Sequence, residues 1–290
     1  MSSPRRRAGH DPARQTKVSA RPEGDRTIRK GIYFLPNLLT TGALFAGFYA
    51  VVAAMDGNFE KAAVAIFVAM LLDGLDGRVA RLTSTESDFG KEYDSLADMV
   101  SFGLAPALVV YEWGGETLRE LGWAWGKFGW LAAFFYSVCA AFRLARFNSR
   151  AGGKSSKRFF EGLPSPSAAA LVAALVWLCT DYGITGTTAF IGGFFFTAAA
   201  GGLMVSNLLY YSGKEFNLGG RVPFAFLLVI PAVFMLISLD PPLVLFLLFV
   251  LYVSSGPALL LWRLARRRSR RDADDDDPDR DREDEHSEAA

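Results

Sequence analysis

The stretch DGLDGRVARL, residues 73–82, places two aspartates directly after a long apolar run, where a membrane-spanning segment is expected to end. Asp73 and Asp76 are followed a short distance along the chain by Asp94 and Asp98. Carboxylates are the ligands that Mg²⁺, Mn²⁺ and Ca²⁺ prefer, and a pair of such ions suits in-line displacement at phosphorus. A carboxylate can also remove the proton of a hydroxyl nucleophile. These residue types therefore indicate metal-assisted transfer at phosphorus.

The spacing of the aspartates predicts two antiparallel helices that face each other. One face of the first helix carries, at positions i, i+3, i+4 and i+7, Asp73, Asp76, Gly77 and Ala80. One face of the second carries, at intervals of four, Gly90, Asp94 and Asp98. The stretch 82–89, rich in Ser and Thr, turns the chain between them. Because Gly77 and Ala80 are small, the backbones can approach closely and a ligand can lie against them.

Four unpaired aspartates in this position would be costly. One Asp at mid-bilayer costs about 2.5–3.5 kcal/mol, so four would cost on the order of 10 kcal/mol. Pairing with Arg78, Arg81 and Lys91 at a helix cap would account for only one or two of them. The sequence therefore predicts that the four carboxylates bind divalent cations, two Mg²⁺ or Mn²⁺ ions.

Composition predicts that these helices belong to a membrane protein. The 290 residues are 51% hydrophobic and include 24 Phe. We expect an all-α, polytopic membrane helix bundle, with spans of about 20 residues each. The eight expected spans are 33–55, 61–82, 92–112, 124–147, 166–182, 187–210, 222–239 and 242–263. The only histidines, His10 and His286, lie in polar tails, which excludes imidazole-based chemistry within the membrane body.

The charged residues divide the chain and predict its orientation. Residues 1–30 form a basic arm expected to be disordered, 31–265 the transmembrane domain, and 266–290 a disordered tail that is first basic and then acidic. Lys and Arg gather on one set of loops, which predicts that both termini are cytoplasmic. The acidic motif then lies at the cytoplasmic side of the cell (inner) membrane.

The aspartates form part of a longer pattern. The sequence Asp73-x2-Asp76-Gly77-x2-Ala80-Arg81-x8-Gly90-x3-Asp94-x3-Asp98 resembles the signature of the CDP-alcohol phosphotransferases at all eight positions. The flanking segments DSLADMVSFGLAPA, FRLARFN and GLPSPSAAA resemble the phosphatidylserine synthase branch of that family. The resemblance implies a six-helix core with extra C-terminal spans, a homodimer, and transfer of the phosphatidyl group of CDP-diacylglycerol to L-serine with release of CMP.

The resemblance also implies roles for individual residues. Asp73, Asp76 and Asp94 are expected to bind the metal ions, while Asp98 contacts metal and acts as the general base. Gly77, Arg81 and Ser87 are expected beside the nucleotide diphosphate, and Ala80 is also expected to bind substrate.

Three further residues follow from the FRLARFNSR segment. Arg143 and Arg146 lie three apart on one helical face, where they could receive the serine carboxylate or a donor phosphate, and Asn148 follows them. The sequence does not assign the two arginines between these ligands. Asn37, near the start of the first span, is expected either to line the substrate site or to cap a helix.

Three alternatives remain beside this reading. The acceptor could be glycerol phosphate, inositol phosphate or another small alcohol, although Met99 stands directly after Asp98, where a lysine would favour glycerol phosphate. An intramembrane prenyltransferase would need two distant Asp-rich motifs. A carboxylate-lined cation transporter would need acids near mid-membrane and broken helices in repeated halves. We expect no nucleic-acid partner.

Overall fold

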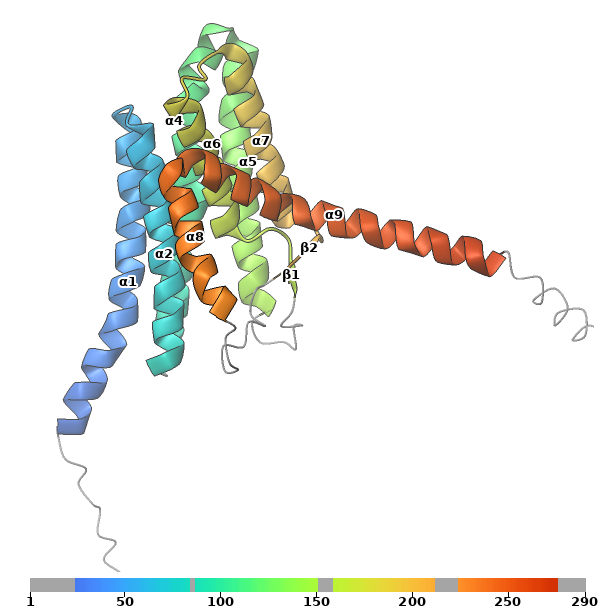
Figure 1. The fold of residues 1–290 in the computed structure, drawn as a ribbon. Coiled ribbons are helices and arrows are strands. Elements are labelled where there is room, and N and C mark those ends of the chain that lie inside the picture. The colour runs from blue at the N-terminus through green and yellow to red at the C-terminus, as the bar shows by residue number, and fades with distance from the viewer. Residues whose placement is uncertain (1–23, 84–86, 151–158, 212–223, 276–290) are drawn as a thin grey trace, which may run out of the picture.

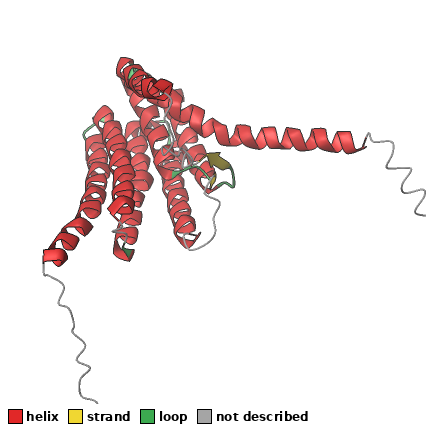
Figure 2. Ribbon diagram, turned by 60° about the horizontal axis from the view of Figure 1, so that its bottom comes forward, coloured by secondary structure: helices red, strands yellow, loops and turns green. Residues whose placement is uncertain are grey.

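The structure, a computed structural model, describes residues 24–83, 87–150, 159–211 and 224–275 (Figure 1). The described chain is almost entirely helical, as Figure 2 shows. The helices are, in chain order, α1 (Gly24–Met55), α2 (Phe59–Thr83), α3 (Asp88–Asp98), the π-helix η1 (Met99–Leu104), α4 (Ala105–Glu120), α5 (Trp123–Arg150), α6 (Ser165–Asp181), α7 (Thr187–Val205), α8 (Phe224–Leu239) and α9 (Pro241–Asp275). Since α3, η1 and α4 follow one another without a break, a helical segment is found at each of the eight predicted spans.

Five helical segments in the described chain are long and apolar enough to cross a membrane. They are Leu35–Met55, Asp88–Glu120, Trp123–Ser149, Thr187–Val205 and Pro241–Trp262. The α2 helix falls outside this group because charged residues enter it, and α6 is shorter. In both views α9 extends away from the bundle at a steep angle to α1 and α2 (Figures 1 and 2). The structure is therefore that of a helical membrane protein, while the number of eight spans stays a prediction.

The ends of the helical region differ from the predicted boundaries. The α1 helix begins at Gly24, within the arm expected to be disordered, and α9 continues to Asp275, within the expected tail. Arg and Ala are good helix formers, and extending an existing helix costs far less than starting a new one. The apolar helices thus continue into their charged flanks.

The expectation of an all-α fold needs one correction, a two-stranded antiparallel sheet. Strand β1 (Phe159–Glu161) pairs with β2 (Leu209–Tyr211), with Phe160 opposite Tyr210. The pairing continues past β1, because the Gly162 amide donates to the carbonyl of Leu208 at 2.8 Å. The aromatic residues of both strands favour an extended backbone. The sheet ties the chain entering α6 to the chain leaving α7.

Small side chains allow the helices near the acidic motif to pack closely. The contact between α1 and α2 is built largely of buried alanines: Ala43, Ala46, Ala50, Ala53, Ala54, Ala62, Ala63, Ala65 and Ala69. Small residues at such interfaces let helix backbones approach each other in a membrane. The π-helix η1 lies deeper, in contact with α1, α4, α5 and α6. The α1 helix thereby packs against both α2 and α3, and η1 packs against the end of α3.

Candidate active site

The acidic motif forms one cluster at the end of the bundle where α2 ends. Asp73 and Asp76 on α2 and Asp94 on α3 each offer a carboxylate oxygen, and these oxygens all lie within 4.8 Å of one another. Two ligand atoms on opposite sides of one Mg²⁺ ion are about 4.2 Å apart, given metal–oxygen distances of about 2.1 Å. The cluster therefore has the dimensions of a divalent cation site.

Asp98 joins the cluster through Asp73. The two carboxyl groups are in hydrogen-bonding contact, and Asp98 also lies within electrostatic range of Asp94. The prediction that the two helices face each other with their aspartates is thus confirmed. Four ionised acids packed this closely repel one another, and bound cations and nearby arginines can offset that repulsion.

The start of α3 is fixed by a helix cap. The Ser87 hydroxyl accepts a hydrogen bond from the backbone amide of Gly90 at 3.0 Å. Serine is a favoured N-cap because it satisfies one of the free amides of the first turn. The Ser87 oxygen, predicted beside the nucleotide diphosphate, therefore has a structural contact as well. Most of the turn from α2 to α3, residues 84–86, lies outside the described residues.

Thr40 of α1 holds one of the aspartates in place. Its hydroxyl lies 2.7 Å from Oδ2 of Asp76 and 3.1 Å from the carbonyl oxygen of Pro36. Both Thr40 and Asp76 are buried. Partners of this kind orient metal-binding carboxylates and raise metal affinity. Thr40 was not among the residues predicted for the site, although its position one turn after Pro36 was a usable signal.

Replacing Thr40 by valine is expected to weaken divalent cation dependence about tenfold, because Asp76 loses the donor that orients it. The measurement is the Mg²⁺ concentration that gives half-maximal activity. Thr41→Val is the matched control, since the Thr41 hydroxyl contacts Tyr93 at 2.9 Å and not an aspartate. Equal metal dependence in the two variants would contradict the positioning role of Thr40.

Asn37 lies beside the second helix of the motif. It is an interior residue of α1, so the helix-cap alternative is excluded. Its Oδ1 atom lies near Gly90: a Cβ added to Gly90 would be 3.5 Å from that oxygen. Asn37 therefore borders the acidic cluster from the α1 side, next to α3.

Gly77, Ala80 and Arg81 lie on the last turns of α2. The Arg81 guanidinium folds back over Gly77, within 3.5 Å of where a Cβ would be, and interacts electrostatically with Asp76. Arg81 is exposed, and Gly77 and Ala80 are partly so. This strip of α2 thus presents a cation and two small residues next to the carboxylates, which suits an incoming anionic group.

The two arginines of α5, predicted to serve together, have separate partners. Arg143 donates from Nη1 to the Ser165 hydroxyl at 2.5 Å and faces Asp98 and Asp73 electrostatically. Arg146 instead forms an ion pair with Glu161 of β1 at 2.9 Å. It also donates to the carbonyl of Val205 at 3.2 Å. Arg143 belongs to the acidic cluster, whereas Arg146 holds the small sheet against α5.

Asn148 also makes a contact between helices. Its Nδ2 donates to the hydroxyl of Ser95 at 2.9 Å, and that hydroxyl lies 3.0 Å from the carbonyl of Lys91. Ser95 directly follows Asp94 on α3. Asn148 therefore braces α3 against the end of α5, one residue away from the carboxylates.

A π-helix follows directly after Asp98, and the periodicity of the sequence gave no sign of it. The wider turns of η1 leave carbonyls that side chains of α5 satisfy. The Tyr136 hydroxyl donates to Phe102 at 3.0 Å, and the Ser137 hydroxyl lies 3.2 Å from the Gly103 oxygen. From within η1, Ser101 donates to the carbonyl of Ala43 on α1 at 3.0 Å. π-Helices occur often at functional sites, and this one anchors the chain beside Asp98.

Taken with the apolar bundle around them, the four aspartates and the adjoining arginines define a membrane enzyme that acts on an anionic substrate. The profile of the CDP-alcohol phosphatidyltransferase family matches residues 33–204, and the chain belongs to that family. The match covers α2, α3 and η1 completely and ends before α8 and α9.

Curated relatives of the chain share one named activity. The chain is 40% identical over 187 residues to the CDP-diacylglycerol–serine O-phosphatidyltransferase of Helicobacter pylori (strain J99), covering 63% of this chain and 74% of that protein. It is 36% identical over 170 residues to the enzyme of that name from Mycobacterium leprae, covering 57% and 53%. It is 37% identical over 155 residues to the one from Saccharomyces cerevisiae, covering 48% and 52%.

Proposed function

We propose that this protein transfers the phosphatidyl group of CDP-diacylglycerol to L-serine, giving phosphatidylserine and CMP. The observation that carries the proposal is the cluster of Asp73, Asp76 and Asp94 with Asp98 in contact. The activity for which the relatives are named supports both the donor and the acceptor. That activity favours neither the alternative of a cation transporter nor the alternative of transfer to another alcohol.

The acidic cluster is the proposed metal site. Carboxylate oxygens alone suit Mg²⁺ or Mn²⁺, and the spacing of Asp73, Asp76 and Asp94 fits one such ion. With Asp98 included, the four acids have enough oxygens for the two ions expected from the sequence. When bound, such ions would offset the negative charge of the diphosphate and of the leaving CMP.

The residues of the chain supply the remaining steps of the proposed mechanism. The Asp98 carboxylate accepts the proton of the serine hydroxyl, while the oxygen of that hydroxyl bonds to the phosphorus that carries diacylglycerol. The bond from that phosphorus to the CMP oxygen breaks, and CMP leaves with the electron pair. Arg81 stabilises charge on the diphosphate, and the small side chains of Gly77 and Ala80 leave room for it. Ser87 and Asn37 border the same space from α3 and α1.

Arg143 is the proposed receptor for the carboxylate of serine. Its guanidinium lies on the Asp98 side of the cluster and is oriented by Ser165, so a carboxylate bound there would bring its hydroxyl near Asp98. Arg146 is occupied by Glu161 and Val205. We assign Arg146 and Asn148 to supporting the site rather than to direct substrate contact.

Replacing Arg143 by glutamine is expected to raise the KM for serine at least about tenfold, because a charge-assisted pair with the serine carboxylate is lost. The KM for CDP-diacylglycerol should change much less. Arg146→Gln is the matched control. It should lower the thermal unfolding midpoint by freeing the β1 strand, with little change in the KM for serine. The reverse pattern, with serine binding lost in Arg146→Gln alone, would contradict the assignment.

The test of the function is CMP release by the purified full chain with CDP-diacylglycerol and Mg²⁺ or Mn²⁺. L-serine, glycerol 3-phosphate and inositol phosphate are supplied in parallel, with Asp98→Asn as the blank. Serine-dependent release that the blank lacks supports donor, acceptor and reaction together. Release with another acceptor would overturn the serine assignment while keeping the chemistry, and no release with any acceptor would overturn both.

We further propose that the enzyme lies in the cell (inner) membrane with both termini and the acidic cluster on the cytoplasmic side. The gathering of Lys and Arg on that set of loops supports this orientation. Water-soluble serine and CMP would then exchange with the cytoplasm while the acyl chains of the donor stay in the bilayer. A homodimer, as the family resemblance implies, is the proposed assembly.

A further inference from the structure

The α9 helix, the last that the structure describes, packs against the bundle beside the acidic cluster. Its buried residues Phe249, Val253 and Gly256, at intervals of four and three, form the face toward the bundle. Phe249 meets Phe67 of α2 with the ring centres 6.0 Å apart, and α9 also contacts α6 and β2. The family match ends at residue 204. This face is therefore an addition to the part of the chain that the family profile covers.

Tyr252 lies on the same side of α9 and is held next to the β1–β2 sheet. Its ring centre is 5.8 Å from that of Tyr210 on β2. Tyr210 is bound to α9 in turn, because its hydroxyl donates to the carbonyl of Val253 at 3.3 Å. A Cβ at Gly256 would lie 2.4 Å from the Tyr210 ring, so only glycine lets the strand come this close. The position of Tyr252 relative to the sheet is thereby fixed.

The same sheet borders the end of α5 that carries Arg143. Glu161 of β1 forms its ion pair with Arg146, one turn after Arg143. Ser165, four residues after Glu161, accepts a hydrogen bond from the Arg143 guanidinium at 2.5 Å. Tyr252 and Arg143 also lie within electrostatic range of each other. The guanidinium thus has a serine hydroxyl from α6 and a phenol hydroxyl from α9 near it.

The partners of the two α5 arginines differ in charge, and this difference decides what each arginine can bind. Arg146 is paired with an acid of β1, so its charge is already offset. Arg143 has the hydroxyl groups of Ser165 and Tyr252 near it, while the acids that it faces belong to the proposed metal site. Neutral hydroxyls can orient a guanidinium without cancelling its charge. The charge of Arg143 therefore stays available for a carboxylate.

Tyr136 of α5 is a second phenol within electrostatic range of Arg143. It is fully buried, and its hydroxyl donates to the carbonyl of Phe102 in η1 at 3.0 Å. Tyr252 is instead partly exposed, as a residue at the border of a substrate site is expected to be. Of the two phenols, Tyr252 is therefore the one suited to act where a substrate enters.

We propose that α9 completes the site for the acceptor, with the hydroxyl of Tyr252 holding the Arg143 guanidinium in position for the carboxylate of serine. This inference rests on the proposed function, because it takes Arg143 as the receptor for serine. Tyr252 is a positioning residue, which acts through Arg143 and does not touch the reacting atoms. A helix beyond the family match thus takes part in binding the acceptor.

The test is the kinetics of CMP release by the purified full chain carrying Tyr252→Phe, which removes the hydroxyl and keeps the ring. The KM for serine should rise about five- to tenfold, because a charged group loses one of the oxygens that orient it. The KM for CDP-diacylglycerol and the half-saturating concentration of Mg²⁺ should stay near those of the wild type. If Tyr252 served packing alone, the KM for serine would not change either, because the ring is kept.

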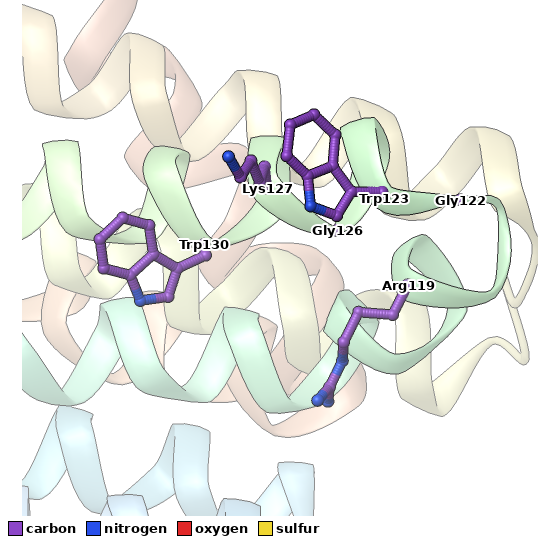
Figure 3. Close-up of a pocket in the computed structure, with 6 residues that line it drawn as sticks. All are labelled: Arg119, Gly122, Trp123, Gly126, Lys127 and Trp130. Carbon is purple, nitrogen blue, oxygen red and sulfur yellow. The ribbon is translucent and has the colours of Figure 1, made fainter.

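Tyr111→Phe is the matched control for this variant. The Tyr111 ring centre lies 5.7 Å from the Arg119 guanidinium, so this residue is also a tyrosine next to an arginine. Arg119, however, lines a cavity near the start of α5, whereas Arg143 lies near the end of that helix (Figure 3). The control should keep the KM for serine of the wild type, and an equal rise in both variants would overturn the proposal.

Arg143→Gln, alone and combined with Tyr252→Phe, shows whether the hydroxyl acts through the arginine. The double variant should have the KM for serine of Arg143→Gln, because changes within one interacting pair do not add. A further rise in the double variant would overturn the role of Tyr252 and leave the proposed function standing. An unchanged KM in Tyr252→Phe, with Arg143→Gln impaired, would do the same. No serine-dependent release by the wild type would instead overturn the proposed function, and this inference with it. Unfolding midpoints establish that the variants are folded.

Discussion

Replacing Asp98 by asparagine is expected to lower serine-dependent CMP release about 10³-fold. Asparagine keeps the size of the side chain but cannot accept the serine proton, and general-base catalysis contributes about 10²–10⁴-fold to rates. Asp98 is in hydrogen-bonding contact with Asp73 and interacts electrostatically with Arg143, the proposed receptor for serine. The measurement is the turnover number at saturating serine and metal.

Asp88→Asn is the control for this variant. Asp88 lies on the same helix but is exposed, at the far end from Asp98, with only a long 4.0 Å contact to Lys91. It should keep turnover near that of the wild type. If Asp98→Asn regains full turnover at high Mn²⁺, Asp98 serves to bind metal and the assignment of Asp98 as the base is wrong.

Removing one of the clustered carboxylates should act on metal dependence instead. Asp76→Asn is expected to raise the half-saturating concentration of Mg²⁺ at least about 10²-fold, because even a partner that only hydrogen-bonds to a metal ligand changes metal affinity 10- to 100-fold. Asp76 is buried and accepts a hydrogen bond from Thr40, so its carboxylate is held in a fixed position. The measurement is CMP release after chelation, over a titration of Mg²⁺ and of Mn²⁺.

Glu92→Gln is the matched control for Asp76→Asn, since Glu92 is an exposed acid of α3 that is not part of the cluster. An unchanged metal titration in Asp76→Asn would show that the aspartates do not hold the ion. A parallel shift in Glu92→Gln would point to general surface charge rather than to a specific site.

The parts of the site that could be predicted from sequence are those set by local periodicity. The intervals between Asp73 and Asp76, and between Asp94 and Asp98, are properties of single helices, and they predicted that the four carboxylates lie together, as the structure has them. Thr40 reaches Asp76 across 36 positions of sequence, a contact that depends on how α1 packs against α2. No pattern within one helix contains that information.

The two arginines illustrate the same limit at closer range. Arg143 and Arg146 are three residues apart, hence about 60° apart around α5, and the sequence predicted a shared role. That angle is enough to direct one toward Asp98 and the other toward Glu161 on β1. The β1–β2 sheet that supplies Glu161 joins segments about 50 residues apart. Its absence from the prediction is why Arg146 was grouped with substrate.

The last helix, α9, in which the sequence showed no functional motif, contacts the site region. Tyr210 of β2 donates to the carbonyl of Val253 on α9 at 3.3 Å, and a Cβ at Gly256 would lie 2.4 Å from its ring. The Tyr210 and Tyr252 rings are 5.8 Å apart, and Tyr252 is within electrostatic range of Arg143. The last helix, outside the family match, thus packs behind the arginine proposed to bind serine.

The π-helix η1 also fixes how many residues can lie between Asp98 and the start of α4. Each residue advances the face of a helix by about 100°, and the i to i+5 bonding of Met99–Leu104 accommodates one residue more than a regular turn. Deleting one residue there would restore regular helix and rotate Asp94 and Asp98 away from Asp73, while α4 kept its packing. A deletion at the exposed turn after α4 would leave that angle unchanged. Chain length in η1, independent of which residues fill it, is therefore part of what keeps the four carboxylates together.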